Sequence, residues 1–265
     1  MTDFALSVLT APSGKTYLFS LGQAGFIIKS TSGQLLAIDL YLSDCVERIE
    51  GHKGFKRLLP KILSPYDLEF DVVISTHFHR DHFDIDAIPS IMANGRTMLF
   101  AAEDCRESVR QLEMTENNIT FVKPDMTCTH GDFTIDFVKC DHGTGAPEAV
   151  GVMVKVDNKL IFETGDSCLR LDWVDDFKKI GTPDVLIAPI NGAFGNMNEK
   201  DCAVFADTME AKLTIPCHYG MFASHGGNVG RFYEIMTTQY PGRDFCIMSQ
   251  GERLILQRLE YGERI

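Results

Sequence analysis

The chain has 265 residues, of which 45% are hydrophobic and 23% charged, and these values exclude general disorder. Its formal net charge of −12 argues against a nucleic-acid partner, because binding to phosphates needs clustered Lys and Arg. No apolar run approaches the roughly 18 residues of a membrane-spanning helix, and residues 1–6 lack the pattern of a signal peptide. None of the eight cysteines forms a C-x-x-C pair, so we expect a reduced cytoplasmic protein.

The first half of the chain begins with apolar or alternating runs that predict strands. Helical patterns then alternate with further strands. In chain order we expect strands at 16–19, 25–29, 35–39 and 72–76, a helix at 85–93, a strand at 97–101 and a helix at 103–113.

The second half repeats this order, with strands first and then helices between strands. We expect strands at 133–139, 150–156 and 159–162, a helix at 171–180, a strand at 184–188, a helix at 199–211, and strands at 213–216, 245–248 and 253–256. Asp157-Asn158 is typical of a tight turn between strands. The pattern predicts two similar α/β halves, for which two sheets packed face to face with helices outside is one arrangement. Other layered α/β arrangements fit the same order.

The segment from His77 to His82 has the pattern H-x-H-x-D-H and directly follows a predicted buried strand. In extended backbone His77 and His79 point to the same side and can bind one metal ion. Asp81 and His82 follow where the chain must bend, so they can face a second ion. Four ligand-type residues within six positions indicate a metal site, because packing does not need them.

Three isolated residues elsewhere have the right chemistry to complete such a site. His142 follows strand 133–139, Asp166 follows strand 159–162 in a Thr-Gly-Asp context, and His218 follows strand 213–216. A single histidine after a strand is usually structural. Together with the H-x-H-x-D-H segment, however, the three form a coherent set at one edge of the predicted sheets.

This ligand pattern resembles that of the metallo-β-lactamase superfamily, and the similarity is closer to L-ascorbate-6-phosphate lactonase-like hydrolases. Further segments that support this branch are Leu21-Gly-Gln-Ala-Gly-Phe, Asp39-Leu-Tyr-Leu-Ser-Asp, residues 190–198 and residues 216–222. The resemblance spans nearly the whole chain. It implies an α+β, four-layer αββα sandwich that forms one domain over residues 1–265.

The resemblance also implies how the ligands divide between two divalent metal ions, Zn or Mn. One ion would be held by His77, His79 and His142, the other by Asp81, His82 and His218, with Asp166 as the bridge. Imidazole ligands favour Zn, and the lactonase branch favours Mn. An iron redox site fits less well, because di-iron members of the superfamily usually carry a carboxylate where this chain has His79.

Two metal ions would activate a water as hydroxide and polarise the bond to be cleaved, with Asp81 and Asp166 as catalytic residues. Several further residues are candidates for substrate binding. Asn191 and Asn196 could bond substrate oxygens or simply form turns. Tyr219 could donate to an oxyanion or pack, and His225 could contact a phosphate or cap the next helix. Gln23 could line the site, whereas Arg80 could bind an anion or pair with a carboxylate.

These observations favour a hydrolase acting on a small molecule. The resemblance suggests a lactonase on a phosphorylated sugar acid such as L-ascorbate 6-phosphate, and it also suggests self-association into a homo-oligomer. Two alternatives remain open at this point. A phosphodiesterase or nuclease could use the same two-metal site, and the chain could be a metal-binding module without catalytic activity.

Overall fold

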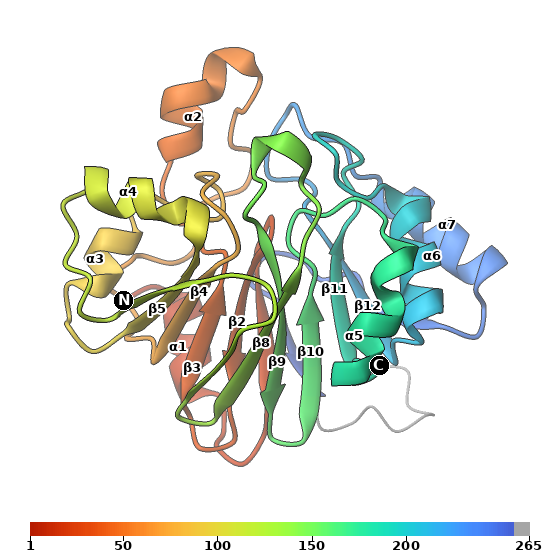
Figure 1. Cartoon of the computed structure of the whole chain (residues 1–265), viewed down its shortest axis with the longest axis horizontal. Coiled ribbons are helices and arrows are strands. Elements are labelled where there is room, and N and C mark those ends of the chain that lie inside the picture. The colour runs from red at the N-terminus through yellow and green to blue at the C-terminus, as the bar shows by residue number, and fades with distance from the viewer. Residues whose placement is uncertain (257–265) are drawn as a thin grey trace.

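A computed structural model describes residues 1–256 and shows two seven-stranded mixed sheets with helices on their outer faces (Figure 1). The first sheet has the order β14-β1-β2-β3-β4-β5-β6. Its strands are β1 (Tyr17–Gly22), β2 (Gly25–Lys29), β3 (Leu35–Ile38), β4 (Val72–Ser75), β5 (Met98–Ala102), β6 (Ile119–Val122) and β14 (Arg253–Ile255). The strands from β3 to β6 are parallel, whereas β14, β1, β2 and β3 pair antiparallel.

The second sheet repeats this plan in the order β13-β12-β11-β10-β9-β8-β7. Its strands are β7 (Thr127–His130), β8 (Phe133–Lys139), β9 (Val150–Val156), β10 (Lys159–Glu163), β11 (Val185–Pro189), β12 (Leu213–Cys217) and β13 (Asp244–Phe245). The strands from β10 to β13 are parallel and those from β7 to β10 antiparallel. The two halves are therefore similar, except that the last strand, β14, returns to pair with β1 of the first sheet.

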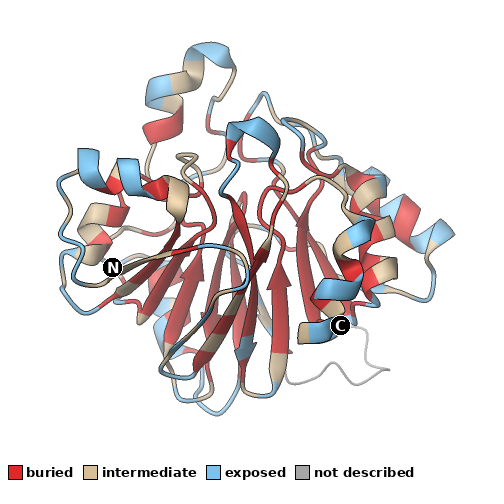
Figure 2. Ribbon diagram, viewed as in Figure 1, coloured by how far each residue is buried: buried red, intermediate tan, exposed pale blue. Residues whose placement is uncertain are grey.

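The helices cover the sheets on both sides. The helices are α1 (Asp3–Thr10), α2 (Cys45–Glu50), α3 (Ile88–Met92), α4 (Arg106–Gln111), α5 (Val174–Ile180), α6 (Glu199–Met209) and α7 (Val229–Gln239). Figure 1 shows α3 and α4 on one side of the sandwich and α5, α6 and α7 on the other. The central strands of both sheets are mostly buried and the outer helix faces are exposed, as Figure 2 shows. This is the four-layer αββα sandwich that the resemblance implies.

The sequence placed most strands correctly and several helices imprecisely. The tight turn at Asp157-Asn158 is confirmed, because both residues have the positive φ that a two-residue hairpin of type I′ requires. The helix expected at 85–93 begins only at Ile88, and the one expected at 171–180 starts with a 3₁₀ turn, Leu171–Trp173. The strand expected at 245–248 was wrong beyond Phe245. Helices α1, α2 and α7 and strands β6 and β7 were not predicted.

The topology brings the ends of distant strands to one edge of the sandwich. Strands β3 and β4 are parallel neighbours, so both end at the same edge of the first sheet. In the second sheet β8, β10 and β12 all run in one direction and also end together. A backbone hydrogen bond from Val150 to Thr76 (2.9 Å) joins the two sheets close to this edge. Residues that follow these five strands are thus able to meet.

Candidate metal centre

The H-x-H-x-D-H segment leaves β4 at the edge where the strands of both sheets end. Strand β4 is completely buried between parallel neighbours, which gives the segment a rigid base. The chain bends after His79, whose carbonyl accepts hydrogen bonds from the backbone N–H of His82 (2.9 Å) and of Phe83 (2.7 Å). This bend directs His77 and His79 to one group of side chains and His82 to another.

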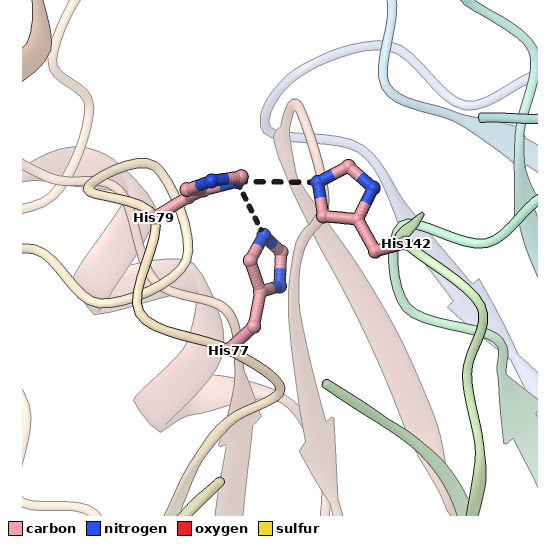
Figure 3. Close-up of side chains that lie close together, drawn as sticks. All are labelled: His77, His79 and His142. Carbon is pink, nitrogen blue, oxygen red and sulfur yellow. Dashed lines mark hydrogen bonds between the residues drawn. The ribbon is translucent and has the colours of Figure 1, made fainter. Parts of the chain in front are cut away.

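The first group, cluster A, consists of His77, His79 and His142 (Figure 3). The Nδ1 atom of His79 lies 3.0 Å from Nε2 of His77 and 3.2 Å from Nε2 of His142. Three nitrogens at about 2.0–2.1 Å from a tetrahedral ion are roughly 3.3 Å apart, so these separations suit one cation. The structure thus brings together the three histidines that the resemblance assigned to one ion.

The second group, cluster B, consists of Asp81, His82 and His218, and Asp166 lies against it. The Nε2 atoms of His82 and His218 lie 3.6 and 3.5 Å from Oδ2 of Asp81. The Oδ2 atom of Asp166 lies 3.4 Å from Nε2 of His82 and 3.0 Å from Nε2 of His218.

Asp166 also reaches cluster A. Its Oδ2 atom is 3.9 Å from Nε2 of His142, and Asp166, His77 and His82 form a third set of possible ligands. One carboxylate therefore stands between the two clusters, which is the position required of a bridging ligand.

Asp39, which directly follows β3, orients His82 of cluster B although the sequence did not single it out as a site residue. Its carboxylate accepts hydrogen bonds from the backbone and hydroxyl of Thr76 (2.8 and 2.7 Å), and it lies 2.7 Å from Nδ1 of His82. A proton on Nδ1 shared with Asp39 leaves Nε2 of His82 free to bind a metal ion. The only available signal was a carboxylate after a predicted strand on the same edge as His77.

Gln23, in the turn between β1 and β2, supports cluster B from the other side. Its Nε2 donates to Oδ2 of Asp81 (2.9 Å) and lies 3.1 Å from Nε2 of His218, whose backbone N–H donates to the Gln23 carbonyl (2.8 Å). The residue is buried and has a positive φ of 55°. The sequence placed Gln23 beside the site, and the structure shows that it orients a carboxylate and a histidine of cluster B.

The two clusters differ in electrostatics. Burial lowers the pKa of His77 and of His79, and it lowers the pKa of His142 to about 4, so these rings are neutral at pH 7. Burial acts in the same direction on His218, but the charges of Asp166 and Asp81 outweigh it and raise the pKa of His218 to about 9. Cluster B therefore attracts positive charge, whereas cluster A offers neutral nitrogen ligands.

The side chains fit divalent cations. Imidazole nitrogens and carboxylate oxygens are the ligands that Zn, Mn and related metals bind in proteins. The Nε2 atom of His82 is buried and has no hydrogen-bond partner among residues 1–256, although it faces two carboxylates. A cation at this point would satisfy that nitrogen and would neutralise the carboxylates around it.

The structure gives different outcomes for the candidate substrate-binding residues. Asn191 and Asn196 are both buried near this edge. The hydroxyl of Tyr219 donates to the Met248 carbonyl (2.8 Å), which agrees with the packing alternative. The helix-cap alternative for His225 was wrong, because Asn228 caps α7.

His225 and Arg80 both have partners near the metal centre. The ring of His225 packs 5.0 Å from that of His218. Arg80 pairs with Glu50 (3.3 Å) rather than standing free, as the carboxylate alternative predicted. The contacts of His225 with phenylalanines of other segments could not be inferred from sequence spacing.

No helix within residues 1–256 is long and apolar enough to cross a membrane. All eight cysteines lie in this range and are free. Burial raises the pKa of the Cys140 and Cys217 thiols, so neither supplies a thiolate at neutral pH.

Comparison with known proteins agrees with the fold. A 26% identical relative, a UPF0173 metal-dependent hydrolase of Methanosphaera stadtmanae, aligns over 87% of this chain and 95% of its own length. Igni18, a metallo hydrolase from Ignicoccus hospitalis, superimposes with a TM-score of 0.69 at 18% identity over 91% of this chain and 98% of Igni18.

The same fold is shared by a protein with different chemistry. CmlA, a diiron β-hydroxylase from Streptomyces venezuelae, has a TM-score of 0.69 at 14% identity over 92% of this chain and 54% of CmlA. The family model described as "Beta-lactamase superfamily domain" matches residues 17–218, a span that includes every candidate ligand. The chain therefore belongs to the metallo-β-lactamase superfamily.

Proposed function

We propose that this chain is a metal-dependent hydrolase that opens an ester or lactone bond of a small molecule with two divalent cations, Zn or Mn. The observation that carries the proposal is the position of Asp166 between an all-histidine cluster and a mixed carboxylate–histidine cluster. Two sites that share one carboxylate hold their ions close enough to act on the same bond. The relatives named metal-dependent hydrolases support the same class of reaction.

The residues of this chain would have distinct roles in that reaction. Cations bound at the two clusters would lower the pKa of a water towards neutrality and polarise the oxygen of the scissile bond. Asp166 fixes the separation of the two clusters. Asp81, oriented by the Gln23 amide, would accept the proton from the attacking water. Asp39 holds His82 in the tautomer that leaves Nε2 free.

Carboxylic esters and lactones fit better than phosphodiesters. Enzymes that act on phosphoryl groups usually present Arg or Lys to the charged oxygens. Arg80, the cation inside the histidine segment, is paired with Glu50, and Arg170 is paired with Asp141 (2.6 Å). A phosphorylated sugar acid such as L-ascorbate 6-phosphate would have to displace one of these pairs.

A hydrolysis screen tests the proposal. Zn- and Mn-loaded protein would be assayed against lactones, aryl esters, 6-phosphogluconolactone and bis(p-nitrophenyl) phosphate, with chelator-treated protein as control. We expect metal-dependent cleavage of a lactone or ester. Cleavage of the phosphodiester alone would favour the phosphodiesterase alternative. Stoichiometric metal binding without any cleavage would favour a non-catalytic module.

A further inference from the structure

The loop from residue 190 to residue 198, between β11 and α6, is fixed directly beside the two clusters. The backbone N–H of Ile190 donates to the carbonyl of Cys217 (3.1 Å), the residue before His218. The backbone N–H of Met197 donates to the carbonyl of Ser167 (2.9 Å), the residue after Asp166. The loop is therefore held at both ends by the neighbours of two candidate ligands.

Two asparagines in this loop are buried without partners. Asn191 and Asn196 are 6% and 7% exposed, and the oxygen and nitrogen of both side-chain amides have no hydrogen-bond partner among residues 1–256. Asn198 in the same loop behaves differently, since its Oδ1 accepts from the backbone N–H of Lys200 (2.9 Å) and Asp201 (3.0 Å) and caps α6. Burying an unpaired amide costs free energy. A ligand that forms hydrogen bonds with these two amides would remove this cost.

An aromatic group of side chains lies at the tip of the same loop. Phe194, at the tip of the loop, is 62% exposed, and its ring lies 5.8 Å from Phe55 and 5.5 Å from His225. His225 in turn lies 5.0 Å from the ring of His218. Phe194 has a positive φ of 56°, a conformation that costs energy for a bulky residue and is typical of functional loops. The rings form a continuous row of aromatic contacts from the exposed Phe194 to His218 of cluster B.

The cations of the neighbouring segments share one carboxylate. The nearby cations Lys53 and Arg80 both pair with Glu50, at 3.1 and 3.3 Å. A ligand bound against Phe194 would therefore meet aromatic rings, beside cations that already have an ion-pair partner.

We propose that the substrate of this centre is a molecule with a flat apolar part. The flat part packs on Phe194 and Phe55, and neutral polar atoms bond to the amides of Asn191 and Asn196. This inference rests on the proposed function, because it assigns the substrate class of the same site. It disfavours a phosphorylated sugar as the substrate.

Stability measurements distinguish a binding role of the asparagines from a structural one. Asn198→Ala should lower Tm by about 2–4 °C, because it removes a helix cap. Asn191→Ala and Asn196→Ala should leave Tm of the ligand-free, metal-loaded protein within about 1 °C of wild type or raise it, since no hydrogen bond is lost. A drop as large as that of Asn198→Ala would assign both amides to the fold and overturn the proposal.

Binding measurements test the ligand class without requiring turnover. Phenylacetamide, a neutral aromatic amide, should bind metal-loaded protein more tightly than acetamide in an NMR titration. Phe194→Ala should weaken phenylacetamide binding about 3- to 10-fold, and Asn191→Ala should do the same. Tyr233→Ala is the matched control, because this ring is 56% exposed but packs on Phe245 at the opposite end of β12. Equal effects of the Phe194 and Tyr233 variants would contradict the proposal.

Turnover adds a second, separable readout. We expect kcat/KM for dihydrocoumarin, an uncharged aromatic lactone, to exceed that for 6-phosphogluconolactone, and Phe194→Ala to raise KM with little change in kcat. A preference for the phosphorylated lactone would overturn this inference but leave the hydrolase proposal intact. If no ester or lactone is cleaved but phenylacetamide binding depends on Phe194 and Asn191, the hydrolase proposal fails and the subsite stands.

Discussion

Clusters A and B are built from similar residues at the same edge, yet they differ in charge. In cluster A three buried histidines face one another, and burial lowers the pKa of each. In cluster B the histidines face Asp81 and Asp166, whose charges overcome the same effect of burial on His218. The comparison teaches that cluster A is ready to bind a cation at neutral pH, whereas a cation entering cluster B must displace a proton.

The largest effect should come from the residue that the clusters share. Asp166→Ala removes the carboxylate next to His82, His218 and His142, so both clusters should lose affinity for metal ions. Because metal ions contribute several kcal/mol to stabilising the transition state, we expect kcat/KM to fall at least about 1,000-fold. Steady-state kinetics with saturating Zn or Mn would measure this. A loss below tenfold would show that Asp166 does not bridge.

A smaller effect is expected from the residue that orients His82. Asp39→Asn keeps the shape of the side chain but weakens the hold on Nδ1 of His82, so affinity for metal at cluster B should fall about 10- to 100-fold. Competition with a fluorescent chelator would measure it. Asp157→Asn is a suitable control, because Asp157 also accepts several hydrogen bonds but from Thr16 and Thr31. Equal losses in both variants would contradict the role of Asp39.

The clusters also predict opposite pH dependences of stability in metal-free protein. The pKa of His142 is lowered from 6.5 to about 4, so its contribution is lost as the pH falls from 6.5 towards 4. The pKa of His218 is raised from 6.5 to about 9, so its contribution is complete below pH 6.5 and is lost as the pH rises through about 9. Tm should therefore be highest near pH 6.5. His218→Gln should flatten only the alkaline side, and an unchanged alkaline limb would refute this assignment.

The sequence predicted the seven ligand-type residues because each follows a strand, and strand ends can be inferred from hydrophobic patterns. It could not identify Asp39 as the residue that orients His82, because a single carboxylate after a strand is too common to be distinctive. The aromatic contacts beside cluster B could not be predicted from the sequence either. Phe55 and Phe194 come from loops about 140 residues apart in the printed sequence, and only the fold places their rings 5.8 Å from each other.

Secondary structure shows the same division between local and non-local information. Alternating strands such as β8 were predicted with their bounds, since half-burial imposes a period of two on the sequence. Edge strand β7 was missed, because its residues are partly exposed and polar. Helix α7 was missed although Asn228 caps it, because glycines before it indicate a loop.

Metal content tests the account of two clusters most directly. Wild-type protein reconstituted with Zn or Mn and analysed by elemental mass spectrometry should contain about two ions per chain. His79→Ala, which removes the central ligand of cluster A in Figure 3, should retain about one ion and lose hydrolysis while remaining folded. His52→Ala, which alters an exposed histidine, should retain two. Two ions in the His79 variant, or at most one in the wild type, would contradict the account.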